Sequence, residues 1–193
     1  MQEIRLVRVG DVDSEILSWL LVALADTLKM PCTLEQKVID PTNAYHSGRQ
    51  QYYSTQLLGE VRNCANGASG KILGVCDIDL YIPILTFVFG EAQLRNCSAL
   101  ISISRLRQSF YGLPEDYDLL FARCEKEAIH ELGHTFGLVH CRRFDCVMHF
   151  SNSIEQIDLK SNTFCPSCGA ALSLLYPALS KTLDKTKPRS ENS

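Results

Sequence analysis

The 193-residue chain lacks any long hydrophobic run. Its longest uninterrupted apolar stretch, Trp19 to Ala25, is far shorter than the roughly 20 residues that a membrane-spanning helix needs. The N-terminus also lacks the apolar segment of a signal peptide, because Glu3, Arg5 and Arg8 alternate with its apolar residues. We therefore expect a cytoplasmic protein that does not bind membranes.

An excess of positive charge is also missing. The chain has 19 Lys and Arg against 22 Asp and Glu, a formal net charge of −3. This balance offers no basic surface for nucleic acid, so we expect no nucleic-acid partner. A hydrophobic content of 46% and a charged content of 21% are ordinary for a soluble globular protein. The length suits one domain with a sizeable core, which we expect to be monomeric.

The cysteines lack the pattern of a disulfide framework. There are nine of them, an odd number, in a chain that is too long to be a small disulfide scaffold, and four have metal-ligand spacing. This usage favours a reducing compartment. The other five are expected to be small, mostly buried residues, although a pairing among them stays open: Cys32, Cys64, Cys76, Cys97 and Cys124.

The strongest motif in the chain is the run from His130 to His140. His130 and His134 are four residues apart, so on a helix they share one face and can reach one metal ion. Glu131 lies beside them and is free to act on a metal-bound water. Gly137 can adopt positive φ and end the helix, which lets His140 approach the same metal from outside it. Three imidazoles leave one tetrahedral position for water, as in a catalytic zinc site.

The full pattern is HExxHxxGxxH followed by Met148, which is the metzincin signature. Cys141, Cys146 and a closing Cys165-Pro-Ser-Cys168 follow the third histidine. Together these residues resemble the archaemetzincins, a metzincin-like peptidase family. The resemblance covers about a fifth of the chain, from His130 to Cys168, and the separation of Met148 from Cys165 by 16 residues differs from the family's usual gap by about one residue.

The resemblance implies two zinc ions per chain. A catalytic zinc would bind His130, His134 and His140, with Glu131 as general base and Met148 in a turn beneath the metal. The second zinc would bind four thiolates, those of Cys141, Cys146, Cys165 and Cys168. A lone C-x2-C could be a redox pair, but no thioredoxin-like context precedes it. Four thiolates make a closed, structural site, which we expect to hold together a C-terminal lobe beginning near residue 141.

Hydrophobic periodicity predicts the order β-α-β-α-β-β-β-α, with a cysteine-bearing region after the last helix. The expected strands cover residues 3–9, 34–39, 71–76, 85–90 and 99–104, and the expected helices cover 14–29, 43–63 and 117–136 or so. Asp13 or Ser14 can cap the first helix and Asp116 the last one. This alternation predicts a single α/β (α+β) domain built on a twisted mixed sheet. Metzincin likeness implies an antiparallel edge strand above the active-site helix, which we assign to residues 85–92.

The C-terminal region is predicted to hold a short helix at 171–179, and residues 181–193 are polar enough to be disordered. The peptidase domain would then cover residues 1–180. No room for an inhibitory propeptide precedes the first strand, so the enzyme should be active as synthesised.

The sequence therefore predicts a zinc metallopeptidase that acts on peptides or proteins. The alternative is a zinc-stabilised protein-binding module with little turnover, because four-cysteine zinc sites often support interaction surfaces. His46 is expected to be an exposed histidine, Asp77 and Asp79 to be surface carboxylates, and His149 to be a loop residue rather than a ligand. The substrate, endo- or exopeptidase action and the oxyanion-stabilising residue stay unassigned.

Overall fold

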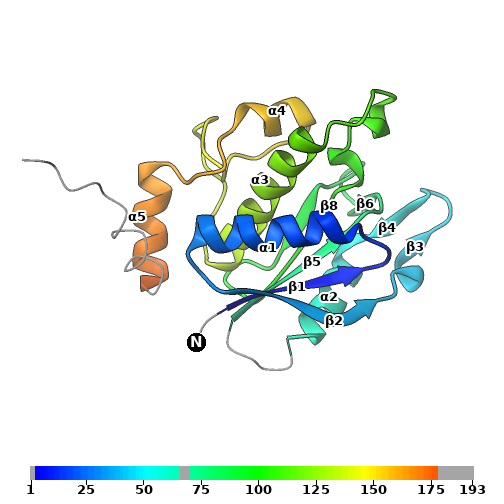
Figure 1. Ribbon diagram of the computed structural model, residues 1–193, viewed down its shortest axis with the longest axis horizontal. Helices are drawn as coiled ribbons and strands as arrows, with labels where there is room; N and C mark the ends of the chain where they lie inside the picture. The colour runs from blue at the N-terminus through cyan, green and yellow to red at the C-terminus, as the bar shows by residue number, and fades with distance from the viewer. Residues whose placement is uncertain (1–2, 66–69, 178–193) are drawn as a thin grey trace, which may run out of the picture.

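The computed structural model describes residues 3–65 and 70–177. The central sheet has five strands in the order β2-β1-β5-β8-β7 (Figure 1). They are β1 (Glu3–Val9), β2 (Cys32–Ile39), β5 (Gly70–Cys76), β7 (Gly90–Ala92) and β8 (Ser98–Ser102). The first four in the spatial order are parallel, and β7 pairs antiparallel with β8 at one edge. The prediction of a mixed sheet with an antiparallel edge strand is confirmed.

Helices cover both faces of this sheet (Figure 1). Two of them, α1 (Ser14–Leu28) and α3 (Tyr117–Thr135), share one core with Leu6 and Leu73, whereas α2 (Ser54–Asn63) lies in a second core with Val7 and Ile72. Adjacent residues of a strand point to opposite faces of the sheet. A strand that is buried on both faces is therefore apolar at odd- and even-numbered positions alike. The apolar runs in β1 and β5 follow from this burial.

The first helix matches its prediction closely. Asp13 caps α1 by accepting a hydrogen bond of 2.8 Å from the Glu15 N–H. The predicted apolar face is the buried one, made of Ile16, Leu17, Leu20, Leu24 and Leu28. Lys29 then adopts φ 53°, the left-handed conformation that ends the helix.

The second helix is shorter than predicted. Residues 42–44 form a 3₁₀ turn, and β3 (Tyr45–His46) and β4 (Gln51–Tyr53) form a hairpin before α2 begins at Ser54. β4 also pairs with β6 (Leu80–Tyr81), a strand almost 30 residues away along the chain. The prediction of one helix from residue 43 was wrong because this non-local pairing was not visible in the local pattern.

Residues 85–89, predicted as a strand, are instead an irregular segment before β7. The segment begins with a turn in which the Leu85 N–H donates to the Ile82 carbonyl at 3.1 Å. Side chains, rather than a neighbouring strand, then bond to its backbone carbonyls. Arg49 donates to the Leu85 carbonyl at 2.8 Å and Gln51 to the Thr86 carbonyl at 2.9 Å. The edge strand is therefore confined to three residues.

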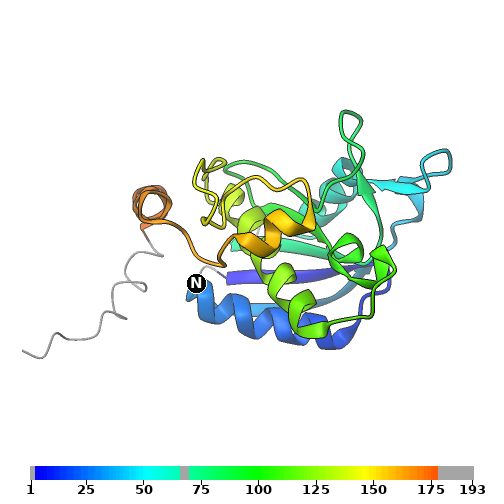
Figure 2. The same ribbon diagram turned by 90° about the horizontal axis from the view of Figure 1, so that it is seen from above.

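The C-terminal region contains α4 (Ile154–Leu159) and α5 (Pro166–Leu175). Seen from above, the segment after α3 folds back over that helix before it reaches α5 at one end of the molecule (Figure 2). The last helix starts five residues earlier than predicted, because Cys165 occupies its N-cap position and Pro166 its first turn, where proline is favoured. The predicted disordered tail at 181–193 lies outside the described residues. No helix in the described part of the chain has the length and apolarity to cross a membrane.

Candidate active site and metal centres

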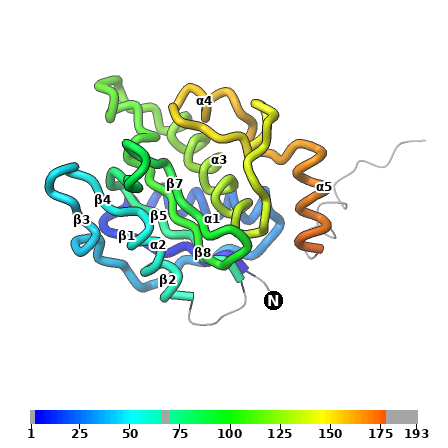
Figure 3. The backbone as a smooth tube through the Cα atoms, turned by 180° about the vertical axis from the view of Figure 1, so that it is seen from behind, coloured from blue at the N-terminus to red at the C-terminus, as the bar shows by residue number. Residues whose placement is uncertain are grey.

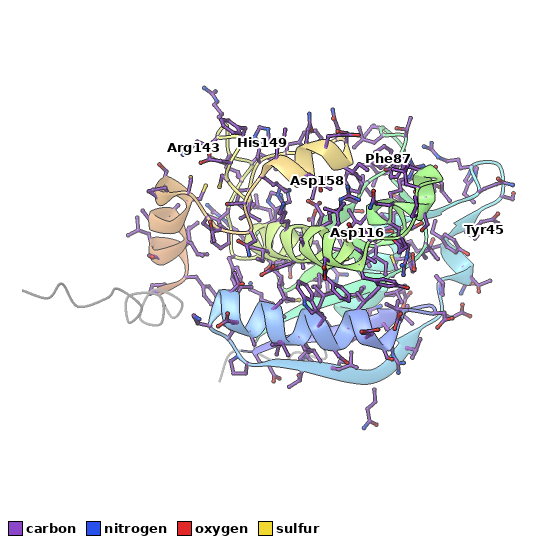
Figure 4. All side chains as sticks on the ribbon, turned by 45° about the horizontal axis from the view of Figure 1, so that its top comes forward. Tyr45, Phe87, Asp116, Arg143, His149 and Asp158 are labelled. Carbon is purple, nitrogen blue, oxygen red and sulfur yellow. The ribbon has the colours of Figure 1, made fainter. Side chains whose placement is uncertain are left out.

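The active-site helix α3 crosses one face of the sheet beside the edge strand β7 (Figure 3). Asp116 caps its start by accepting a hydrogen bond of 3.0 Å from the Leu119 N–H (Figure 4). Leu120, Ala128 and Leu132 are buried toward the core and fix the rotation of the helix. This rotation turns the candidate residues of the HExxH motif toward the cleft.

The end of α3 reverses the chain as the motif predicts. Gly137 has φ 104°, and its N–H donates to the His134 carbonyl at 2.9 Å. The Leu138 N–H reaches back to the Gly133 carbonyl at 3.0 Å. These two bonds satisfy carbonyls at the helix end and direct the following residues back toward the cleft.

The reversal brings three imidazoles together. The candidate ligand nitrogens of His130, His134 and His140 all lie within 4.8 Å of one another. The Nε2 atoms of His130 and His134 are 3.1 Å apart. Two nitrogens bound tetrahedrally to zinc at about 2.0–2.1 Å would be roughly 3.3 Å apart, so the observed pair fits such an ion.

Backbone carbonyls orient two of these rings. The Nδ1–H groups of His130 and His134 donate to the carbonyls of Val147 and Leu138, each at 2.8 Å. The Nε2 lone pairs are therefore left for a metal, an arrangement typical of histidine ligands. Burial lowers the pKa of all three imidazoles, that of His130 most strongly, and so favours the neutral form that can bind a metal.

Glu131 is buried at the foot of the cleft, under the edge strand. A Cβ atom on Gly90 would lie 2.7 Å from Cγ and 2.8 Å from Oε1 of Glu131. Burial raises the pKa of the Glu131 carboxyl well above its usual value, and the nearby Glu127 adds to this effect. The carboxyl group therefore lies in an environment that raises its proton affinity, beside the histidines.

Lys160 and Glu127 form a buried ion pair behind the site, which the sequence analysis missed. The Lys160 ammonium donates to Glu127 Oε1 at 2.7 Å, with the two side chains 0% and 5% exposed. Glu127 precedes His130 by three residues on α3, so helical spacing alone could have assigned it to the site. Lys160 gave no such signal, because it reaches Glu127 from the loop after α4.

The three histidines line a cleft of about 660 Å³ together with Glu127 and Glu131. Its upper wall comes from residues 82 and 85–92 and its floor from α3, with Phe150 and Asn152 among the residues on the far side. Arg105 holds the upper wall from behind: it pairs with both oxygens of Asp79 at 2.6 and 2.8 Å and lies 4.2 Å from the Phe87 ring centroid. Phe87 is labelled in Figure 4, next to the right-hand end of α4 in that view. The cleft is thus braced by side chains that do not face it.

The four cysteines with metal-ligand spacing also converge. The thiol groups of Cys141, Cys146, Cys165 and Cys168 lie within 4.8 Å of one another, and the sulfurs of Cys141 and Cys165 are 3.8 Å apart. Tetrahedral zinc–sulfur bonds of about 2.3 Å give a similar separation of roughly 3.8 Å. Hydrogen bonding, chiefly from the Cys168 N–H, lowers the pKa of Cys165 to about 7 and favours its thiolate. The five remaining cysteines form no disulfide; as expected most are buried (Cys64, Cys76 and Cys124), and Cys32 and Cys97 are half-buried.

Met148 is fully buried and packs against the active-site helix. A Cβ on Gly133 would collide with the Met148 sulfur and lie 3.1 Å from its Cε. The Cys141 N–H donates to the Met148 carbonyl at 2.9 Å, and His149 makes its 3.0 Å contact through Nδ1 to the Cys141 carbonyl. His149 is not one of the three histidines whose ring nitrogens converge as candidate metal ligands. This turn joins the two candidate metal sites.

The other sequence candidates are not part of the site. His46 lies exposed on the hairpin, with its ring against Tyr81. Asp77 pairs with Arg107 at 2.8 Å, and Asp79 pairs with Arg105. Both carboxylates were expected at the surface; they are half-buried, and each is held in an ion pair with an arginine.

Comparison with known proteins identifies the family. The model of peptidase family M54 matches residues 6–173. The archaemetzincin of Methanocaldococcus jannaschii is 45% identical over 160 residues, which cover 83% of this chain and 87% of the relative. A crystal structure of a zinc-dependent peptidase from Methanocorpusculum labreanum superposes with a TM-score of 0.78 at 30% identity, covering 88% of this chain and 99% of the other.

The archaemetzincin of Archaeoglobus fulgidus, solved in complex with malonate, has a TM-score of 0.73 at 32% identity and covers 86% of this chain and 98% of the other. The sequence resemblance and the predicted fold class are confirmed by these matches. The chain therefore belongs to the archaemetzincins, peptidase family M54, and is a zinc metallopeptidase.

Proposed function

We propose that the chain hydrolyses peptide bonds at the histidine cluster, with Glu131 as the general base. The observation that carries this proposal is the juxtaposition of three neutral imidazoles with one buried carboxyl group in a cleft under an open sheet edge. His130, His134 and His140 would hold the zinc. When bound, zinc supplies a Lewis acid that polarises the scissile carbonyl and makes a water molecule more acidic.

Glu131 is suited to proton transfer rather than to metal binding. Its neighbours on the helix, His130 and His134, already supply ligands, and a fourth protein ligand would close the coordination sphere. Held against Gly90, its carboxylate would accept a proton from the attacking water and return it to the leaving amine. Such positioned proton transfer contributes roughly 10²–10⁴-fold to the rate.

The edge strand would hold the peptide. The Phe89 carbonyl accepts from the Ser102 N–H at 2.8 Å, and the Gln93 N–H donates to the Ser98 carbonyl at 3.1 Å. In this register the odd-numbered residues from 89 to 93 direct their backbone hydrogen bonds toward β8. In an antiparallel ladder the alternate residues face the other way. Gly90 and Ala92 therefore direct their N–H and C=O groups toward the open edge, where an extended peptide could add as a further strand.

The four cysteines would hold a second, structural zinc. A set of four thiolates leaves no position for water, so this metal would tie the turn after α3 to the start of α5 and take no part in hydrolysis. The Met148 turn, which runs between the two ligand sets, would transmit that constraint to the histidines.

A peptide-library cleavage screen tests the proposed function. The zinc-loaded protein should cleave peptides, a chelator should stop cleavage, and zinc should restore it. Glu131→Gln should keep the histidine-site zinc but lower hydrolysis by roughly 10²–10⁴-fold. Undiminished cleavage by this variant would assign the base to another residue. Peptide binding without cleavage by the unaltered protein would favour the alternative of a binding module.

A further inference from the structure

Glu91 is the middle residue of the edge strand, and its side chain lies on the face of the sheet that α2 covers. It pairs with Leu100, which is buried in the core beneath α2. The Thr55 hydroxyl, at the start of α2, donates to the Glu91 carboxylate, with distances of 2.9 and 3.1 Å to its two oxygens. Gly90, one residue earlier, faces Glu131 instead. Glu91 thus stands at the cleft rim on the α2 side of the sheet.

Glu91 also differs from the other acidic residues of the cleft in its partners. The Glu127 carboxylate is paired with Lys160, and Glu131 lies beside the histidines. No ion pair found within residues 3–65 and 70–177 involves Glu91, and neither Lys nor Arg lines the described cleft. The charge of Glu91 is held in place by a neutral hydroxyl and is left without a cation.

We propose that Glu91 selects peptides with a cationic side chain, Lys or Arg, at the substrate residue directly across from it. This inference rests on the proposed function, in which the peptide adds antiparallel to β7. Because Glu91 bonds toward β8, it would form a non-hydrogen-bonded pair with the peptide, the type in which opposite side chains approach most closely. Their Cβ atoms would be about 4.5–5.5 Å apart on the same face.

The expected selectivity is modest but measurable. Opposite charges at such cross-strand positions are favourable and like charges are unfavourable, each by a small amount. Lys should therefore be preferred over Glu at this one position by about threefold to tenfold. The rim is open to solvent, so the preference should shrink as the Debye length falls from about 10 Å at 0.1 M salt to about 3 Å at 1 M.

Peptide binding to Glu131→Gln tests the proposal without turnover. N-acetylated, C-amidated peptides of one extended apolar sequence would carry Lys, Gln or Glu at each position in turn, and affinity would be measured by fluorescence anisotropy. We expect one position where Lys binds more tightly than Gln, and Gln more tightly than Glu. Adding Glu91→Gln should remove this order, and adding Glu91→Lys should reverse it. Glu60→Gln, which makes the same charge change at an exposed site on α2, should leave it intact.

Several outcomes would overturn the assignment of Glu91. One is the absence of charge dependence at every position, and another is a Lys preference that survives Glu91→Gln. A third is a preference seen only with uncapped peptides, which would mean that Glu91 binds the N-terminal amine of the peptide and not a side chain. Failure of the proposed function looks different. The unaltered protein would then cleave none of the peptides, while the Glu91-dependent order of affinities would persist.

Discussion

The backbone of Gly90 lies against the carboxyl group of Glu131, close enough that no side chain fits between the edge strand and the active-site helix. A Cβ atom at residue 90 would also lie 2.8 Å from the Leu100 carbonyl oxygen, so it could not move toward the sheet. Glycine is needed here because the helix approaches so closely, and not for its backbone conformation, since φ of Gly90 is not positive. The contact fixes both the height of the edge strand and the position of the proposed base.

Gly90→Ala should therefore impair catalysis more than folding. The added methyl group must displace the Glu131 side chain or lift β7, and either change misplaces the base; loss of a positioned base costs roughly 10²–10⁴-fold. We expect kcat to fall by about 100-fold with the zinc content unchanged. Gly59→Ala is the matched control, because nothing lies within 4 Å of its Cβ position. Full activity of Gly90→Ala would show that Glu131 is not held by this contact.

The candidate metal ligands could be found from the sequence because their spacing encodes their geometry. His130 and His134 are neighbours on any helix, and Gly137 has the conformational freedom to return His140 to them. The cysteines follow the same logic, since Cys165 is the N-cap of α5 and Cys168 lies in its first turn. Local periodicity likewise predicted α1, where the buried face follows the 3.6-residue repeat.

Residues that act through distant partners could not be predicted in this way. Lys160 reaches Glu127 from 33 residues away, and the buried Gln51 bonds Asp79 and Thr86. The edge strand was predicted in the correct region but at too great a length. Before β7, a hydrogen bond from the Arg49 side chain to the Leu85 carbonyl takes the place of strand pairing. Each of these features depends on contacts that the topology creates, and none leaves a periodic signal.

Lys160→Met should destabilise the protein by about 3–5 kcal/mol, because it leaves the buried Glu127 carboxylate without its cation. Urea unfolding would measure this loss. The double variant Lys160→Met/Glu127→Leu removes both charges and should recover most of the stability, since a well-packed apolar pair is often as stable as a buried ion pair. Equal destabilisation by the single and double variants would show that packing, rather than the unpaired charge, is responsible.

Metal analysis should find two zinc ions per chain after zinc supplementation, because the two ligand sets share no residue. We expect a chelator to remove the histidine-site ion first and peptidase activity with it. His140 is exposed and the site keeps a position for water, so exchange should be faster there than at the closed thiolate set. A single zinc at saturation, or loss of the thiolate-site ion first, would contradict this prediction.

Substitution of one ligand from each set should separate the two roles. Cys165→Ser removes a thiolate from the closed site, and because structural zinc binding contributes directly to folding free energy, we expect a large drop in Tm or aggregation. His134→Ala should leave a folded protein that keeps the thiolate-site zinc and has lost hydrolysis. Cys97→Ser, at a partly exposed cysteine outside both clusters, controls for the loss of a sulfur atom. Thermal unfolding followed with metal content would decide the matter: equal Tm values for Cys165→Ser and His134→Ala would mean that the four-cysteine site does not stabilise the fold.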